Sequence, residues 1–397
     1  MADGLDSLEE ELKRTKLREL GPEMRNVRVL VETQTVETAL ARLAEWKVAA
    51  APCHDSNGRF LGFVGVANIL TTFLAEVASE DSPENAMLQR MRCLEEKGET
   101  FGQTPLRCCL EKSSTAFVAD ESTSVHEALI SAFVSLQQHR VPVILSSSST
   151  PRQSSKGLSV SPESVPAGFM PSSCTTEILT IVNASDVAAF IDNKCRQGLL
   201  QSQSASLDTA TLVSLGFGHR SAASVAPRTP TIDVLRRLEA ERSRGIAVCD
   251  DYEGETQGML IANLSLADFG NMHLSHLGSL ALPVGEFMGN LHNVPYSDLF
   301  PTPKSHQSLT VSRRTGEDGR SRTATGQLLA VKNPEDTFRS ALSSLVSNKV
   351  HRLYICQKDS LVPVDVFTLF DCLSTVVNWL PSGHLQDCTV STCTQRS

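Results

Sequence analysis

Two copies of the dipeptide His-Arg stand out because each one opens an apolar segment with the composition of a β-strand. The first is His139-Arg140, followed by residues 141–145, and the second is His351-Arg352, followed by residues 353–356. An arginine guanidinium offers a planar fork of donors to a phosphate, and the neighbouring histidine can add a further donor. In an arbitrary protein such a pair is usually a solvated surface feature, so its interpretation depends on the surrounding pattern.

A second motif, a polar residue followed three positions later by an aspartate, recurs downstream of the apolar strands. An ionised carboxylate can accept both hydrogens of a ribose 2′,3′-diol, and a helix N-terminus offers free amides to phosphate or sugar oxygens. The same spacing is also a common helix cap that needs no ligand. A cationic pair at a strand edge and a carboxylate at the next helix start can together hold the two ends of a nucleotide. The motif occurs as Asn183 with Asp186, Ser265 with Asp268, and Thr368 with Asp371.

Both motifs belong to a pattern of strand, helix, strand, strand and helix that occurs four times. This pattern predicts an α/β protein built from duplicated β-α-β-β-α units. The second copy is longer because the Ser- and Pro-rich residues 146–174 separate its last two strands, and this composition predicts a disordered loop. The first helix of each copy is expected to open near Val36, Val125, Ile232 and Phe338.

The copies divide two and two near residue 205, which predicts a pair of modules. The charged residues 7–20 favour a solvated lead-in helix, and residues 84–97 favour a short helix in a linker. The predicted segments are an N-terminal charged helix (1–23), repeat 1 (24–80), repeat 2 (105–195, with the insert 146–174), repeat 3 (220–275), repeat 4 (283–385, with a mobile loop at 302–327) and a tail (386–397).

Composition excludes several classes of protein. The formal charge of −9 argues against a nucleic-acid binder, which would usually be basic. The N-terminus lacks the basic and apolar regions of a secretory signal, and the most apolar stretch, 361–380, contains Asp365 and Asp371, which disfavour a membrane span. The 11 cysteines form no CxxC pair, so we expect reduced thiols, no metal site and a cytoplasmic or nuclear location.

The repeat resembles the cystathionine-β-synthase (CBS) domain, a β-α-β-β-α unit that pairs into a Bateman module. Four copies without an attached catalytic domain resemble the gamma subunits of AMP-activated protein kinase and their gamma-like relatives. The most specific elements of the resemblance are the His-Arg strand starts in copies two and four, where that family also carries them. The resemblance implies two Bateman modules in a disc with pseudo-twofold symmetry.

By the same resemblance, the protein is expected to be a regulatory, energy-sensing subunit that binds AMP, ADP or ATP, with kinase alpha and beta subunits as partners and no cofactor. The first copy reads Gly65-Val66-Ala67-Asn68, without a carboxylate, and Val48-Ala49-Ala50 carries no basic residue, so its site is expected to be empty or altered. The candidate nucleotide-binding residues are His139, Arg140, Asn183, Asp186, Ser265, Asp268, His351, Arg352, Thr368 and Asp371.

Two other functions compete with this hypothesis. A CBS-repeat scaffold that has lost nucleotide binding is favoured by the altered first copy, by the long insert and by Arg244-Gly245, which replaces the His-Arg pair in the third copy. An enzyme is not expected, because the chain has no phosphate-cradling glycine loop, nucleophile elbow or kinase catalytic motif. The sensor hypothesis requires both His-Arg pairs to face one central cavity, whereas the scaffold hypothesis allows them to face bulk solvent.

Overall fold

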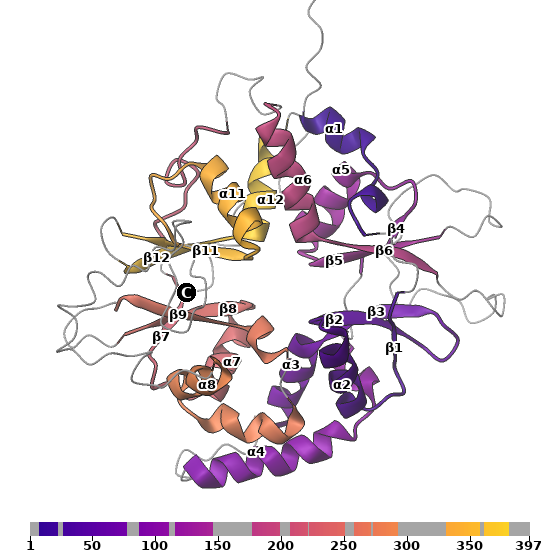
Figure 1. The fold of residues 1–397 in the computed structure, drawn as a ribbon, viewed down its shortest axis with the longest axis vertical. Helices are drawn as coiled ribbons and strands as arrows, with labels where there is room; N and C mark the ends of the chain where they lie inside the picture. Colours follow the sequence, from indigo (N-terminus) through magenta and orange to yellow (C-terminus); the bar gives the residue numbers. More distant parts are fainter. Residues whose placement is uncertain are drawn as a thin grey trace, which may run out of the picture.

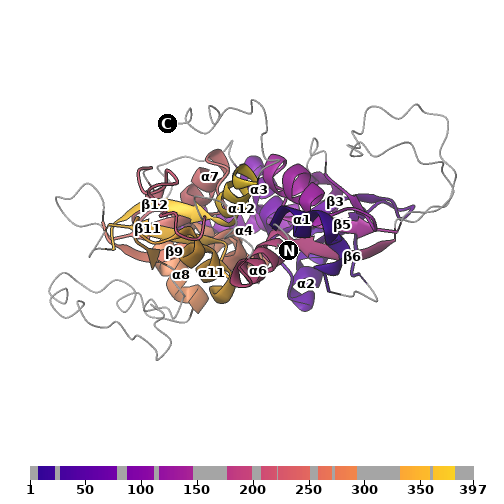
Figure 2. The ribbon, with the colours of Figure 1, turned by 90° about the horizontal axis from the view of Figure 1, so that it is seen from above.

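The fold is taken from a computed structural model. It describes residues 8–22, 27–77, 87–110, 116–145, 177–198, 207–220, 222–250, 258–270, 273–292, 331–357 and 361–380. The predicted insert 146–174, the predicted loop 302–327 and the tail 386–397 lie outside these residues. Four α/β units surround a common centre (Figure 1), and the view turned by 90° shows that they form a flattened disc (Figure 2).

Each repeat contains one three-stranded sheet in which the first strand is parallel to the second and the second is antiparallel to the third. All four sheets have a register shift at the same place, before the last residue of the second strand. The strands are β1 (Leu30–Val31), β2 (Ala50–His54) and β3 (Phe60–Gly65); β4 (Ala119–Asp120), β5 (Arg140–Ile144) and β6 (Ile178–Asn183); β7 (Ser224–Val225), β8 (Gly245–Cys249) and β9 (Leu260–Ser265); β10 (Val331–Lys332), β11 (Arg352–Cys356) and β12 (Pro363–Thr368).

Two helical segments accompany each sheet, so the predicted β-α-β-β-α repeat is confirmed. In three repeats a hydroxyl caps the first helix: Thr35, Ser124 and Thr337 each accept a hydrogen bond from the amide three residues later. The second helix of repeat 3 is only a short 3₁₀ turn. The segments are α2 (Val36–Trp46) and α3 (Val66–Val77); α5 (Val125–Ala128), continued by the π-helical η4 (Leu129–Ser135), and α6 (Ala184–Arg196); α7 (Thr231–Ala240) and η5 (Leu266–Phe269); α11 (Phe338–Asn348) and α12 (Leu369–Trp379).

The repeats are joined in two ways, through their sheets and through their helices. The sheets of repeats 1 and 2 face each other, as do those of repeats 3 and 4 (Figure 1), and Tyr354 and Cys249 belong to a buried cluster between the latter pair. The helices instead form one core shared by repeats 2 and 4, including Phe133 and Leu373, and another shared by repeats 1 and 3, including Phe73. Sheet contacts therefore build the two modules, and helix contacts hold the modules together.

The lead-in helix α1 (Leu8–Arg14) is not solvated as predicted. Leu8 and Leu12 are 1% and 0% exposed and belong to the core of repeats 2 and 4. The buried Glu11 accepts a 2.6 Å hydrogen bond from Lys194 of α6, and this bond lowers the pKa of the Glu11 carboxyl. Leucines four residues apart lie on one face of a helix, so the weak apolar stripe in the sequence was sufficient for docking.

The linker helix α4 (Met87–Gly102) is longer than the predicted 84–97 and packs against η6 (Leu274–Ala281), beyond which α8 (Val284–His292) follows. Figure 1 shows α4 running along the edge of the disc below repeats 1 and 3. Gly98 lets the two segments approach closely, because a Cβ there would lie 2.7 Å from Cδ1 of Leu277. This helix therefore connects the modules as well as the two repeats of the first one. Among the described residues, no helix is long and apolar enough to cross a membrane.

Candidate functional site: a central cationic cavity

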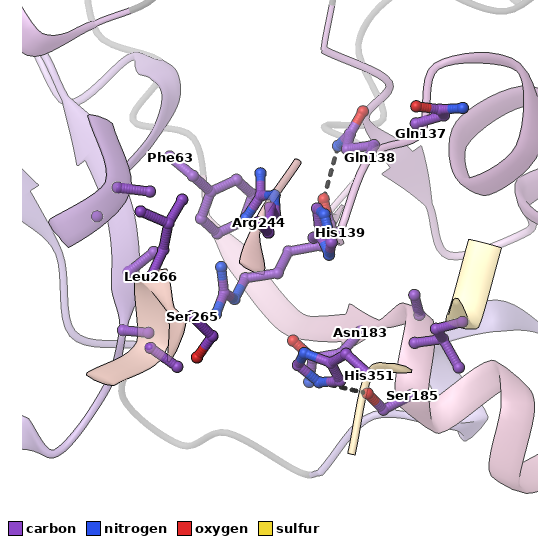
Figure 3. Close-up of a pocket in the computed structure, with 18 of the residues that line it drawn as sticks. Phe63, Gln137, Gln138, His139, Asn183, Ser185, Arg244, Ser265, Leu266 and His351 are labelled. Atoms are coloured by element: carbon purple, nitrogen blue, oxygen red, sulfur yellow. Dashed lines mark hydrogen bonds between the residues drawn. The ribbon is translucent and has the colours of Figure 1, made fainter. Parts of the chain in front are cut away.

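A cavity of about 1050 Å³ lies where the four repeats meet, and every repeat contributes to its lining. Repeat 1 supplies small and apolar residues, among them Ala49, Gly65 and Phe63, whereas repeats 2, 3 and 4 supply basic ones. Figure 3 shows His139, Arg244 and His351 reaching the cavity from three different repeats. The basic residues that line it are His139, Arg140, Arg244, Lys349, His351 and Arg352.

The charge of this cavity is opposite to that of the chain. Among the described residues, no aspartate or glutamate lines the cavity, although the chain carries a formal charge of −9. Gathering four permanently cationic side chains around one space costs free energy through mutual repulsion, and an anion placed between them would remove that cost. The cavity is thus suited to a small anionic ligand.

The sheet register explains why these residues meet. The first residue of the second strand pairs with the last residue of the third strand in every repeat, as Arg140 does with Asn183 and Arg352 with Thr368. The same pairing links Gly245 to Ser265 and Ala50 to Gly65. The residue just before the second strand therefore occupies an equivalent place in each repeat. That residue is Ala49, His139, Arg244 or His351.

Arg244 is a cavity residue that the sequence interpretation missed. The sequence of repeat 3 was interpreted as lacking the His-Arg pair, but Arg244 occupies the histidine position and lines the cavity. Gly245 occupies the arginine position, and a Cβ there would overlap the guanidinium of Arg352. The glycine therefore leaves space for the arginine of repeat 4 beside strand β8. Counting back from Ser265 by the sheet register would have identified Arg244 from the sequence.

Burial and neighbouring arginines keep the two histidines neutral. Desolvation, followed by Arg244 and Arg140, lowers the pKa of His139 to about 2. Desolvation, followed by Arg352, also lowers the pKa of His351. The rings are held by contacts across the disc: the Oγ of Ser185 lies 3.3 Å from Nε2 of His351, a contact drawn in Figure 3.

The partner of His139 comes from the opposite module as well. Its ring meets that of Phe370 edge to face, with the centroids 4.5 Å apart. Ser185 and Phe370 occupy the same position of the helix-start motif in repeats 2 and 4. The two histidine contacts are therefore related by the pseudo-twofold arrangement, and each one ties a strand start of one module to a helix start of the other.

The predicted site residues fall into two groups. Asn183 and Ser265 line the cavity together with the His-Arg pairs, whereas Thr368 and the three aspartates are not among its lining residues. In each case Oδ2 of the aspartate accepts a hydrogen bond from the backbone amide three positions earlier, at 2.8 Å for Asp186, 2.6 Å for Asp268 and 2.8 Å for Asp371. One oxygen of every carboxylate thus caps its own helix.

The altered first repeat keeps this cap with a different group. Oδ1 of Asn68 accepts from the amide of Gly65 at 3.1 Å, in the same way as the aspartates of the other repeats. Gly65 itself has no room for a side chain, because its Cβ would overlap Ala49 and lie 2.6 Å from the Cβ of Ala50. The motif therefore has a structural role in all four repeats, and its ligand-binding role stays a prediction.

Comparison with known proteins identifies the fold. No protein-family model and no curated protein matches the sequence. Among solved structures, a Methanocaldococcus jannaschii protein described as a candidate archaeal homologue of g-AMPK matches with a TM-score of 0.54 and 12% identity, over 91% of this chain and 100% of that chain. An uncharacterised conserved protein from Pyrococcus horikoshii matches with a TM-score of 0.41 and 10% identity, over 91% of this chain and 100% of that one.

Shorter CBS-domain structures align with about half of the chain. One, from Sphaerobacter thermophilus, is the CBS domain of a CBS-domain-containing membrane protein; it matches 46% of this chain and 90% of its own, with 17% identity and a TM-score of 0.29. The fold is that of a CBS-domain protein with four repeats in two Bateman modules. Taken as a whole, the chain resembles the gamma subunit of AMP-activated protein kinase.

Proposed function

We propose that this protein is a regulatory subunit that binds adenine nucleotides (AMP, ADP or ATP) in its central cavity. The observation that carries the proposal is the gathering of Arg140, Arg244, Lys349 and Arg352 around one space that, in the part of the chain that the structure describes, is lined by no carboxylate. Phosphate groups match this set because guanidinium groups bind them through paired, charge-assisted hydrogen bonds. The two neutral histidines can donate further bonds or become protonated when an anion enters.

A ligand in this cavity would act on the arrangement of the modules. The strand starts of repeats 2 and 4 belong to different modules and contribute His139-Arg140 and His351-Arg352 to the same space. An anion held by both pairs would favour the arrangement of the modules in which the two pairs are closest. The size of this shift depends on how much more tightly the anion binds that arrangement than one in which the pairs are further apart. Nucleotide binding would thereby change the surface of the disc.

The likeness to the gamma subunit extends the proposal to partners. A gamma-like protein would pass its occupancy to the catalytic alpha and scaffolding beta subunits of a heterotrimeric Ser/Thr kinase and so report the energy state of the cell. This part of the proposal rests on the resemblance and is tested by co-purification with candidate kinase subunits, with and without AMP.

The binding proposal is tested by calorimetric titration of the purified protein with AMP, ADP and ATP. Replacing a guanidinium that contacts phosphate removes a charge-assisted bond, so Arg140→Ala and Arg352→Ala should each weaken binding by about tenfold to a hundredfold. The matched control is Arg242→Asn, which removes one exposed arginine of repeat 3 at a positive φ of 50° that asparagine tolerates. Absence of binding by a folded sample would contradict the proposal.

A scaffold without nucleotide binding is the second candidate. The observation that favours it is that one oxygen of each aspartate is already engaged in a helix cap. A scaffold would keep its partners when both His-Arg pairs are changed to alanine, whereas a sensor would lose its response to AMP.

A further inference from the structure

The segment between the two modules, residues 207–220, docks on repeat 4 although it precedes repeat 3 in the chain. The amide of Leu212 donates to the carbonyl of Asp336 at 2.9 Å, and the amide of Phe338 donates to the carbonyl of Ala210 at 2.8 Å. Leu212 is fully buried in the core of repeats 2 and 4. We call this segment the connector; its backbone is fixed against the start of repeat 4.

The last residues of the connector lie at the carboxylates of repeat 4. Oδ2 of the buried Asp365 accepts from the amide of Gly218 at 2.8 Å and from Nε of Arg220 at 3.2 Å. The Arg220 guanidinium also lies over the ring of Phe217, 5.0 Å from its centroid. From this position Nη2 of Arg220 is 3.9 Å from Oδ1 of Asp371.

This contact involves the carboxylate oxygen that a ribose would need. Oδ2 of Asp371 already accepts from the amide and the hydroxyl of Thr368, at 2.8 and 2.6 Å. Oδ1 is the oxygen that faces Arg220. A bidentate contact with a ribose diol needs both oxygens, so a ribose and the arginine compete for the same carboxylate.

We propose that Arg220 is a built-in competitor of the fourth-repeat nucleotide site, holding Asp371 until the ribose of an incoming nucleotide displaces the guanidinium. The inference rests on the proposed function and on the predicted ribose contact of Asp371, which is not itself among the lining residues of the central cavity. Arg220 is suited to release because its side chain is 50% exposed and its contact with Asp371 is longer than a hydrogen bond. Ion pairs of that kind stabilise proteins only weakly, so the loss of this contact with Asp371 costs little.

The connector has a pseudo-twofold mate in the segment that precedes repeat 1. The segment ahead of repeat 1 docks on repeat 2 in the same way, and the hydroxyl of Thr180 donates to the carbonyl of Pro22 at 2.8 Å. Thr180 is the register counterpart of Asp365, since it pairs with Val143 as Asp365 pairs with Ile355. A neutral hydroxyl in repeat 2 therefore occupies the place of the carboxylate that engages Arg220 in repeat 4.

The test is a calorimetric AMP titration of four proteins: wild type, Arg220→Ala, Asp371→Ala and the double variant. Removing the competitor should tighten AMP binding by about fivefold in the presence of Asp371, and the gain should disappear in the Asp371→Ala background. A coupled variant, Arg220→Gln with Asp365→Asn, removes the buried charge together with its partner and should give the same gain without leaving Asp365 unpaired. Arg242→Asn is the control for loss of one positive charge.

The outcomes separate this inference from the proposed function. If wild type binds AMP and the Arg220 variants bind equally or more weakly, Arg220 does not compete and the inference is wrong while the nucleotide site stands. If wild type does not bind but the Arg220 variants do, the competitor is stronger than expected and the inference is supported. If none of the proteins binds, both the inference and the nucleotide-binding function are rejected.

Discussion

His139 lies in an environment very different from that of a free side chain. Buried and surrounded by arginines, it has a pKa of about 2, against an ordinary value near 6.5. Above about pH 6.5 the imidazole is neutral in both the folded and the unfolded chain. Below that pH only the unfolded chain takes up the proton, so the stability contributed by the neutral ring is lost as the pH falls.

The first prediction follows from this loss of stability at low pH. Between pH 7.5 and pH 5.5 the free energy of unfolding should fall by about 1 kcal/mol more in wild type than in His139→Asn. Urea denaturation of both proteins at the two pH values measures the difference. Equal pH dependence in both would mean that His139 titrates in the folded protein as it does in the unfolded chain.

A second prediction concerns the aspartate caps. Asp186→Ala removes the acceptor of the Asn183 amide and should lower the free energy of unfolding by about 1 to 2 kcal/mol. Asp186→Asn should cost much less, because Asn68 performs the same function in repeat 1. Denaturant titration in the absence of nucleotide compares the two. A similar loss in both variants would show that charge, and not the cap, is what the position provides.

At the scale of elements, α4 illustrates how packing overrides local preference. Glycine inside a helix costs about 1 kcal/mol relative to alanine, yet Gly98 and Gly102 both lie in this helix. Their cost is offset by the close approach of η6: a Cβ on Gly98 would lie 2.7 Å from Cδ1 of Leu277 and 3.1 Å from the carbonyl oxygen of Leu274. The second of these neighbours is backbone and cannot move aside easily.

The third prediction is that Gly98→Ala destabilises the protein by about 1 kcal/mol, since overpacking outweighs the gain in helix propensity. The exposed Glu99→Ala in the same helix is the matched control and should be close to neutral. Thermal unfolding followed by circular dichroism provides the comparison. A stabilised Gly98→Ala would indicate that α4 and η6 separate readily.

The sequence predicted those elements whose causes are local. Helices begin at Val36, Val125 and Phe338 as expected, because an apolar period and a hydroxyl cap are both visible in the sequence. The docking of α1 was missed because the sequence of α1 alone does not show that a core elsewhere in the chain buries its two leucines. The role of Arg244 was missed because the dipeptide Arg244-Gly245 does not resemble His-Arg. Only the strand register shows that the two dipeptides occupy equivalent positions. The two His-Arg pairs line one cavity, which is the arrangement that the sensor hypothesis requires.

At the scale of the whole molecule, the central cavity concentrates positive charges in a chain whose net charge is negative. The Debye length, which is the distance over which exposed charges still interact, is about 30 Å at 0.01 M salt and about 8 Å at 0.15 M. Salt should therefore stabilise the unliganded protein by weakening repulsion among the cavity cations. The net charge of −9 produces a salt effect of the same sign, so a variant is needed to isolate the cavity contribution.

The fourth prediction is that raising the salt concentration over this range stabilises wild type more than Arg140→Gln, by several tenths of a kcal/mol. The surface variant Arg242→Asn should retain the wild-type gain. Chemical denaturation at the two salt concentrations decides the matter. An undiminished gain in Arg140→Gln would show that the cavity cations are already neutralised by their surroundings.

The segment that precedes repeat 1 packs on repeat 2, and the segment that precedes repeat 3 packs on repeat 4; this has a consequence for synthesis. During translation α1 must wait for repeat 2, and the connector must wait for repeat 4, before either can dock. Leu12 from one end of the described chain and Leu373 from the other belong to the same core. A nascent chain that stalls before α12 therefore leaves α1 in an incomplete core. Both α1 and the unfinished repeat 4 would then be open to proteolysis.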